Sequence, residues 1–242
     1  MDKKVSVVLP AYNERENIVP LVREIKAALG PRAKEILIVD DDSPDGTAQA
    51  ASEAFAGDPE VRVIVRRADR GFANSIRDGL LKATGEVLVV MDSDFNHQPR
   101  YLPFMVQALS DYDCVSASRF LYGGLMLSRA RHLLSWVFNV FVRFATGGKI
   151  TDNLYGYFAI KRPILERCAF DQIFWGYGDY YIRLLYQLQR ERVSILQFPA
   201  VNGERRHGTA NSAFVKTFIR YTIATLGLAF RGWRLRLSHR NA

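Results

Sequence analysis

The chain has 242 residues, of which 48% are hydrophobic and 12% aromatic, enough for one α/β domain or two small ones with a substantial core. Its net charge of +8 favours an anionic partner, which leaves nucleic acid, phosphorylated small molecules and acidic membrane surfaces open. Two cysteines, Cys114 and Cys168, exclude a disulfide framework, and the start lacks a signal-peptide pattern, so we predict buried thiols and a cytoplasmic protein.

The first half of the chain alternates short apolar runs with helical patterns. The apolar runs predict strands over 5–10, 35–39, 61–65, 87–91 and 114–117. Helical spacing predicts helices over 14–29, 47–55 and 72–83. This order predicts a fold of the α/β class, with a doubly wound and mainly parallel sheet.

Acidic or amide side chains follow three of these strands. They are Asn13 and Glu14 after the first, Asp40 to Asp42 after the second, and Asp92 and Asp94 after the fourth. The carboxyl ends of parallel strands meet at one edge of the sheet, where open α/β sheets bind ligands. Several acids at one edge lower stability, so this pattern favours a functional site.

Asp92 and Asp94 are separated by one residue directly after a buried strand. A bare Asp-x-Asp is most simply a polar turn, but paired carboxylates repel each other unless a cation lies between them. With the Asn96 carbonyl as a third oxygen donor, the pair suits Mg²⁺ or Mn²⁺. No glycine-rich phosphate loop follows the first strand, so a phosphate ligand would need a metal and arginines, for which Arg66 and Arg119 lie at strand ends.

Five ordered motifs give the chain a resemblance to family 2 glycosyltransferases. The motifs are Pro10-Ala11-Tyr12-Asn13-Glu14, Val39 to Thr47, Arg66 with Gly71, Ala83-Thr84-Gly85, and Asp92 to Pro99. Within that family the chain most resembles dolichol- or polyprenyl-phosphate mannose synthases, densely over residues 5–120. The resemblance implies a GT-A fold, a nucleotide-sugar donor and an inverting transfer.

The resemblance also implies roles for individual positions. The residues implied to hold the nucleotide sugar are Pro10, Tyr12, Glu14, Asp40, Asp41, Arg66 and Asp92. The implied ligands of Mg²⁺ or Mn²⁺ are Asp92, Asp94 and Asn96, and the implied catalytic residues are Asp94, Arg119 and Arg131. A metal ion and arginines are fixed positive charges beside the departing diphosphate, where negative charge grows.

The predicted reaction transfers a hexose, most simply mannose from GDP-mannose, to a dolichyl or polyprenyl phosphate at the cytoplasmic membrane face. The alternatives are a UDP-sugar such as UDP-glucose, a hydroxyl acceptor, or a non-catalytic module that binds nucleotides or nucleic acid. A lipid phosphate, with a second pKa of ~6, needs no general base. A hydroxyl would need one, and Asp179 is the candidate.

The second half of the chain departs from the family pattern. The departures are Asp152-Asn153-Leu154-Tyr155-Gly156-Tyr157-Phe158, Gly176-Tyr177-Gly178-Asp179-Tyr180-Tyr181 and Arg206-His207-Gly208-Thr209-Ala210-Asn211. These positions would face the sugar or the acceptor, whose phosphate Arg131 and Arg206 would hold. The histidines, which lack metal-site spacing, are interpreted as structural or surface residues: His97, His132, His207 and His239.

Two amphipathic segments complete the chain. Over 129–144 a polar ridge runs along an otherwise apolar helix, which is typical of a buried helix or one in a membrane interface. The ridge is Arg131, Ser135, Asn139 and Arg143. A second helical pattern over 214–230 ends in an arginine-rich tail that suits an anionic membrane surface better than nucleic acid. No segment has the roughly 20 uncharged apolar residues of a transmembrane helix.

These patterns predict the domain organisation. A GT-A domain over 1–211 would comprise a nucleotide-sugar-binding half over 1–120 and an acceptor half over 121–211. Residues 212–242 would form an amphipathic helix and a basic tail at the membrane surface. The expected partners are the nucleotide sugar, the polyprenyl phosphate, an anionic membrane and, as an open possibility, a small membrane-anchoring protein.

Overall fold

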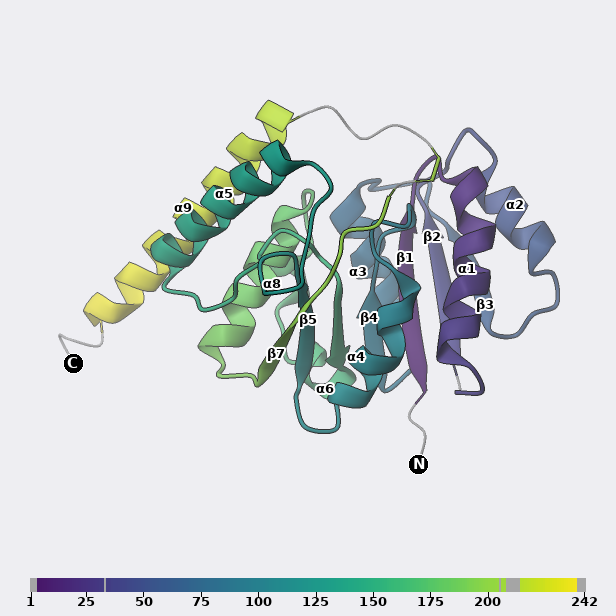
Figure 1. Cartoon of the computed structure of the whole chain (residues 1–242), viewed down its shortest axis with the longest axis horizontal. Helices are drawn as coiled ribbons and strands as arrows, with labels where there is room; N and C mark the ends of the chain where they lie inside the picture. Colours follow the sequence, from purple (N-terminus) through teal and green to yellow (C-terminus); the bar gives the residue numbers. More distant parts are fainter. Residues whose placement is uncertain (1–3, 33, 205, 208–213, 239–242) are drawn as a thin grey trace.

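The computed structural model describes residues 4–32, 34–204, 206–207 and 214–238, except for the side chains at 214 and 234–238. Two features of the sequence, the motif after His207 and the end of the basic tail that contains His239, lie outside these residues. Figure 1 shows a central sheet with helices on both faces and a pair of long helices along one flank. Within the described part of the chain, no helix combines the length and the apolar character needed to cross a membrane.

Seven strands form one sheet in the order β3-β2-β1-β4-β6-β5-β7. Their bounds are β1 (Val5–Ala11), β2 (Lys34–Asp40), β3 (Val61–Val65), β4 (Val87–Val90), β5 (Cys114–Ser118), β6 (Phe158–Lys161) and β7 (Ile195–Pro199). β1 to β4 pair in parallel, whereas β6 runs antiparallel to both β4 and β5. The predicted doubly wound, mainly parallel sheet is confirmed, and β6 and β7 are strands that the apolar pattern did not reveal.

The helices follow the predicted order and extend it. Their bounds are α1 (Arg15–Leu29), α2 (Thr47–Ala54), α3 (Phe72–Lys82), α4 (Leu102–Ala108), α5 (Arg129–Thr146), α6 (Arg162–Glu166), α7 (Phe170–Ile173), α8 (Asp179–Arg190) and α9 (Phe214–Ser238), with a 3₁₀ turn η1 (Pro99–Tyr101). α1, α2 and α4 cover one face of the sheet, and α3, α6, α7 and α8 cover the other.

The central strands β1, β2 and β4 are buried at every position, because successive side chains point to opposite faces and helices cover both. Val7 of β1 joins the cluster beneath α1, and Val8 joins the cluster beneath α3. This explains why the central strands read as continuous apolar runs in the sequence. Both cysteines are buried thiols, as predicted, and burial raises their pKa values, that of Cys168 to about 11.

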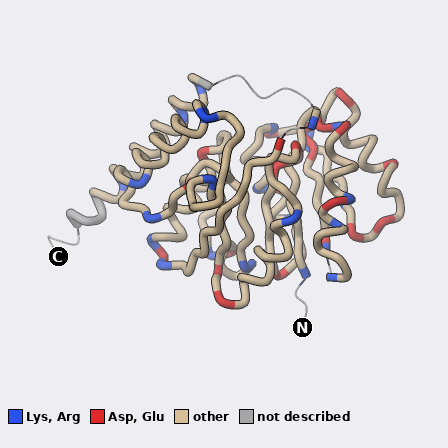
Figure 2. Tube along the Cα trace, in the orientation of Figure 1, with Lys and Arg blue, Asp and Glu red and all other residues tan. Residues whose placement is uncertain are grey.

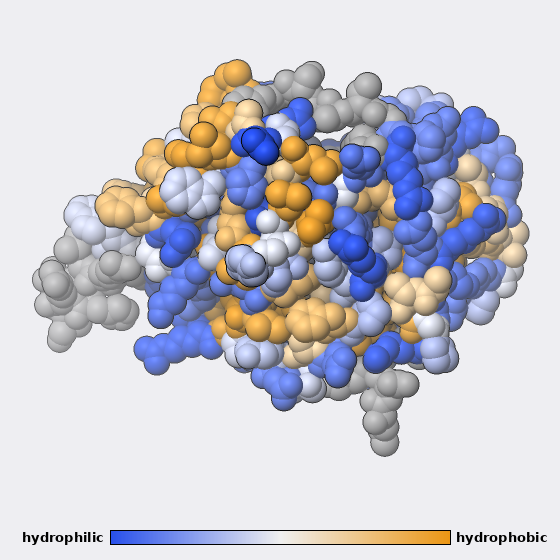
Figure 3. Space-filling model, in the orientation of Figure 1, coloured by the Kyte–Doolittle hydropathy of each residue, from blue (hydrophilic) through white to orange (hydrophobic). Residues whose placement is uncertain are grey.

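α5 and α9 lie side by side and pack on α8 through Phe138, Ile182 and Leu228. Their outer faces leave large apolar side chains in solvent, with Ile223 66% and Phe144 90% exposed. Figure 3 shows hydrophobic side chains gathered over this pair. Neither helix contains an Asp or Glu, and Figure 2 shows only basic residues coloured along both.

The polar ridge predicted for α5 does not face solvent along its length. Asn139 in its middle is buried, and its Oδ1 accepts a hydrogen bond from the backbone N–H of Asn153 at 2.6 Å. The ridge turns inward at its middle, where Asn139 bonds the loop before β6, whereas Arg131 and Arg143 near its ends are exposed. Large apolar side chains of α5 also point outward, among them Trp136 and Phe144.

Glu35 lies near the amino end of β2, at the edge of the sheet opposite the one where the acids gather. Its carboxylate accepts hydrogen bonds from Ser6 Oγ at 2.7 Å, Thr84 N at 2.8 Å and Arg62 Nη1 at 2.6 Å. Burial opposes ionisation, but these bonds outweigh it and lower the pKa of Glu35 to about 2. The carboxylate therefore stabilises the fold above pH 4.5, its ordinary pKa, and this contribution disappears as the pH falls from 4.5 towards 2.

We expect Glu35→Gln to lower the free energy of unfolding by about 2 kcal/mol at neutral pH, since it weakens several hydrogen bonds to a charged group. Urea unfolding measures this loss, with the exposed Glu53→Gln in α2 as the control. The difference between wild type and Glu35→Gln should shrink as the pH is lowered through about 3. A difference that does not depend on pH would contradict this account of Glu35.

Candidate active site at the carboxyl edge of the sheet

The carboxyl ends of β1, β2 and β4 lie at one edge of the sheet, as their parallel register requires. The polar residues that follow these strands are therefore neighbours. Ser93 joins two of the strand ends directly, because its Oγ donates a hydrogen bond to the carbonyl of buried Pro10 at 2.7 Å. The predicted gathering of acidic side chains at this edge is confirmed.

Tyr12 and Glu14 follow β1 and lie in different environments. Tyr12 is 52% exposed, and the guanidinium of Arg70 lies 5.4 Å from the centre of its ring. Glu14 is buried and accepts a hydrogen bond from Asn17 Nδ2 at 2.6 Å, while its backbone N–H donates to Thr47 Oγ1 at 2.9 Å. An open aromatic ring thus lies beside a buried carboxylate.

Asp41, directly after β2, forms an ion pair with Arg66. Arg66 Nη1 donates to Asp41 Oδ1 at 2.5 Å, and Gly71 N donates to Asp41 Oδ2 at 2.6 Å. Arg66 Nε also donates to Asp78 at 2.6 Å. Burial lowers the pKa of Arg66, but these carboxylates outweigh burial and raise it. The pair fixes the loop after β3 against the end of β2.

Asp40 is bound within its own turn. Its two carboxylate oxygens accept hydrogen bonds from Ser43, one from N at 2.9 Å and one from Oγ at 2.5 Å. The side chain is buried, so the turn after β2 holds it in place.

Asp92 and Asp94 follow β4 and differ in exposure. The side chain of Asp92 is 31% exposed, whereas Asp94 is buried. Asp94 accepts hydrogen bonds from Asn96 N at 3.0 Å and Asn96 Nδ2 at 2.7 Å. The Oδ1 atom of Asn96 in turn accepts a bond from Asn202 Nδ2 at 3.1 Å. Within the ranges that the structure covers, no three His, Cys, Asp or Glu side chains cluster as a ready-made metal site.

His97 holds the loop after β4 in place through hydrogen bonds of both ring nitrogens. Asp92 N donates to His97 Nδ1 at 2.8 Å, so the ring proton is on Nε2, which donates to the carbonyl of Tyr155 at 2.8 Å. The ring stacks on Tyr157 with centroids 4.8 Å apart. Burial lowers the pKa of His97 to about 4, so the ring is neutral at physiological pH. Its interpretation as a structural histidine is confirmed.

Arg119 follows β5 at the same edge and is paired with Asp152. Its Nε and Nη2 donate to the two carboxylate oxygens at 2.7 and 2.9 Å, and its backbone N donates at 3.1 Å. Burial lowers the pKa of Arg119, but Asp152 outweighs burial and raises it. The guanidinium also lies 4.7 Å from the ring centre of Tyr155. Sequence reasoning missed Asp152 as this partner because the two residues are far apart in the chain.

Two other arginines with predicted roles form no described ion pair with the acids that follow β1, β2 and β4. Arg131 is exposed in the first turn of α5, whose N-cap is Ser128. Among the described residues, no ion pair joins the Arg131 side chain to the acidic edge. Arg206 pairs with Glu24 at 2.9 Å, and its guanidinium lies 3.7 Å from the ring centre of Phe95.

Asp179 begins α8 and is fully engaged. It accepts hydrogen bonds from Arg183 Nη1 at 2.5 Å and from the backbone N–H of Tyr177 at 2.8 Å. Arg183 stacks on Trp175 with its guanidinium 3.9 Å from the ring centre. Each carboxylate oxygen of this buried side chain thus already accepts a hydrogen bond from the protein, which makes Asp179 a poor candidate for a general base that must accept a substrate proton.

Tyr221 of α9 reaches this region, and sequence reasoning missed it. Its hydroxyl lies so close to Gly178 that a Cβ added there would be 2.0 Å from the oxygen. Burial raises the pKa of Tyr221, with further electrostatic contributions from nearby groups that include Asp179 and Asp92. The available signal was the i, i+4, i+7 spacing of the inward stripe, which consists of Tyr221, Thr225 and Leu228.

Residues 6–169 match the family model described as glycosyl transferase family 2. The chain belongs to this family. It is 37% identical over 168 residues to a dolichol-phosphate mannosyltransferase of Pyrococcus furiosus, an alignment covering 67% of this chain and 47% of that protein. The chain thus spans about half the length of that relative.

Two further comparisons extend over more of the chain. An undecaprenyl-phosphate mannosyltransferase of Micrococcus luteus is 32% identical over 211 residues, covering 85% of this chain and 86% of that protein. The structure of glucosyl-3-phosphoglycerate synthase from Mycobacterium tuberculosis, in complex with Mn²⁺, UDP and glucosyl-3-phosphoglycerate, superposes with a TM-score of 0.69. That likeness has 23% identity and covers 93% of this chain and 78% of the other. The predicted GT-A fold is confirmed.

Proposed function

We propose that this chain transfers mannose from GDP-mannose to a polyprenyl phosphate at the cytoplasmic face of a membrane, with a UDP-sugar as the second candidate donor. The observation that carries the proposal is the exposed apolar pair α5–α9, whose Tyr221 packs against Gly178 beside Asp179. Such a surface beside a nucleotide-sugar site suits an acceptor that remains in a bilayer. The names of the mannosyltransferase relatives support the same acceptor class.

The donor nucleoside would bind between β1 and β2. The exposed ring of Tyr12 offers a stacking surface for the base, and the buried oxygens of Glu14 and Asp40 offer acceptors for base or ribose donors. Asp41 and Arg66 would support this pocket by holding its loop, since each is already hydrogen-bonded to the other.

A divalent cation would be held by Asp92 and Asp94. Two carboxylates fit Mg²⁺ or Mn²⁺, because such ions complete their coordination with water and substrate phosphates. When bound, the ion would supply positive charge to the leaving diphosphate. Asn96 is hydrogen-bonded to both Asp94 and Asn202, which suits orienting Asp94, and direct coordination by Asn96 stays a prediction.

The acceptor phosphate would attack without a general base. Its second pKa of ~6 leaves it largely ionised at neutral pH, and Asp179 is already paired with Arg183. Arg131, exposed at the start of α5, would attract the phosphate, and Arg119 would face the donor phosphates while Asp152 holds its Nε and Nη2. The isoprenoid would remain in the lipid beside the apolar faces of α5 and α9.

Arg131→Ala should lower kcat/KM for a short polyprenyl phosphate at least tenfold, as expected for a lost charge-assisted phosphate contact of about 1.5–3 kcal/mol. The KM for the donor should not change. Arg143→Ala, at the other end of α5, is the matched control. A donor screen in detergent, with GDP-mannose and UDP-glucose in parallel, identifies the nucleotide and sugar in the same assay.

Asp179→Asn tests the acceptor class and should retain turnover within about tenfold, below the ~10²–10⁴ that a general base contributes. An inactive Asp179→Asn together with a nearly normal Arg131→Ala would instead assign a hydroxyl acceptor. Arg183→Lys, which preserves the charge beside Asp179, shows whether any loss comes from disturbing this buried pair.

A further inference from the structure

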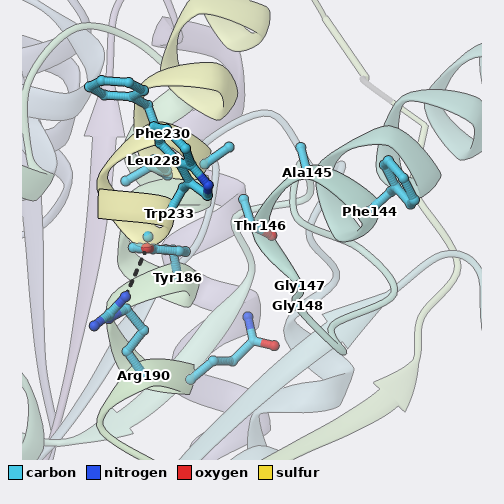
Figure 4. A pocket seen from close by; sticks show the side chains of 13 residues that line it. Phe144, Ala145, Thr146, Gly147, Gly148, Tyr186, Arg190, Leu228, Phe230 and Trp233 are labelled. Carbon is cyan, nitrogen blue, oxygen red and sulfur yellow. Dashed lines mark hydrogen bonds between the residues drawn. The ribbon is translucent and has the colours of Figure 1, made fainter. Parts of the chain in front are cut away.

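A cavity lies between the C-terminal parts of α5, α8 and α9, and its volume is about 610 Å³. Figure 4 shows Phe230 and Trp233 on the α9 side, Thr146 and Phe144 on the α5 side, and Arg190 below them on α8. The volume is in the range of pockets that hold small-molecule ligands. The site proposed for catalysis does not use this cavity.

The walls of the cavity combine an apolar surface with a cationic end. Phe230 and Trp233 are 56% and 57% exposed, so much of their apolar surface is open to a ligand or to lipid. Below this wall, Arg190 Nη1 donates a hydrogen bond to Tyr186 Oη at 3.2 Å and lies 3.9 Å from where a Cβ of Gly232 would be. Within the described residues no carboxylate forms an ion pair with Arg190, so its charge is available to an anion.

Gly232 builds this arrangement by letting α9 approach α8. A Cβ added at Gly232 would lie 2.8 Å from Tyr186 Oη, which is closer than side-chain carbons approach. The hydroxyl that orients Arg190 therefore lies directly beneath α9. The absence of a side chain at Gly232 lets the apolar wall of α9 and the cation of α8 lie next to each other.

We propose that this cavity binds one anionic phospholipid from the membrane surface, with the lipid phosphate on Arg190 and an acyl chain against Phe230 and Trp233. Charge complementarity selects an anionic lipid, because α5 and α9 contain basic residues and no acids. Phe144, Phe230 and Trp233 line the cavity and are also exposed on the apolar flank of the helix pair, where a bilayer would supply the lipid.

This site is separate from the one proposed for the acceptor. Arg131 lies in the first turn of α5 and Phe144 in its last, so the helix rise of about 1.5 Å per residue places them about 20 Å apart. A lipid at Arg190 would anchor and orient the helix pair, whereas the acceptor phosphate would bind at the other end. The proposal requires membrane contact but no assumption about the donor, the sugar or turnover.

The test titrates the full chain with dihexanoylphosphatidylglycerol below its micellar concentration and follows tryptophan fluorescence. The phosphatidylcholine analogue is titrated in parallel, and Trp233→Phe shows whether the signal arises at the cavity. We expect saturable binding of the phosphatidylglycerol and at least tenfold weaker binding of the phosphatidylcholine. Arg190→Ala should weaken binding at least tenfold, Arg190→Lys should restore most of it, and Arg192→Ala, outside the cavity, should have no effect.

Ala229→Phe provides a second variant, because it fills the cavity and leaves Arg190 in place, and it should also abolish binding. Circular dichroism confirms that each variant is folded. Equal binding of the two lipids, or wild-type affinity in Arg190→Ala and Ala229→Phe, would overturn the proposal. Displacement of the phosphatidylglycerol by farnesyl phosphate would assign the cavity to the acceptor, and this result would also overturn the proposal. No donor is present, so these outcomes are independent of the proposed transfer reaction.

Discussion

Asp94→Ala is expected to lower glycosyl transfer by ~10²–10³-fold, the usual loss when one preorganised electrostatic element of a site is removed. Asp94 is buried at the end of β4 and its described hydrogen bonds are local ones to Asn96, so the fold should survive. Initial rates measured over a range of Mn²⁺ concentrations should show that the variant responds weakly to the metal.

Asp111→Ala is the control for this experiment, because Asp111 is an exposed acid that bonds only locally to Ser110 among the contacts described. Its rates should match those of the wild type. Near-normal turnover of Asp94→Ala at limiting Mn²⁺ would remove the Asp92–Asp94 segment from the proposed metal site. Circular dichroism and urea unfolding separate a lost function from a lost fold.

Asp152→Ala is expected to lower the free energy of unfolding by about 3–5 kcal/mol, because it leaves the guanidinium of Arg119 buried without its partner. Asp152 is fully buried and accepts three hydrogen bonds from Arg119, including the backbone one. Activity should fall in the same variant, since Arg119 would lose its fixed orientation at the edge of the sheet. Urea denaturation at neutral pH measures the stability change.

Asp171→Ala supplies a matched comparison, because it also removes the carboxylate of an Arg–Asp ion pair. Asp171 pairs with Arg77 at the surface, where its side chain is 83% exposed. Exposed pairs contribute at most about 1 kcal/mol, so this variant should be nearly as stable as the wild type. Equal losses in the two variants would show that burial does not determine the strength of the Arg119–Asp152 pair.

The sequence by itself determined the scaffold of the site. Apolar runs and helical spacing predicted β1 to β5 and α1 to α3 to within about two residues, because a buried parallel strand must be apolar on both faces. The acids at the strand ends could be assigned to one edge for the same reason, since parallel order leaves no other arrangement. Ordered motifs then predicted the family, which the family match confirmed.

Only the tertiary structure decided which charges are available at that edge. Arg66 and Arg119 both read as free phosphate-binding arginines in the sequence, yet they are tied to Asp41 and Asp152, which lie 25 and 33 residues away in the chain. The sequence pattern could not reveal these pairs, because a hydrogen bond between distant residues depends on how the strands pack and leaves no local periodicity.

The orientation of α5 and the reach of α9 were likewise decided by packing. The helical period identified one polar ridge on α5 but could not say that Asn139 turns inward to bond the backbone of Asn153. It also could not place Tyr221 against Gly178, a contact that exists because α9 packs on α8. Local sequence fixes the faces of a helix, and the free energy of burying one face against the rest of the chain decides where that face points.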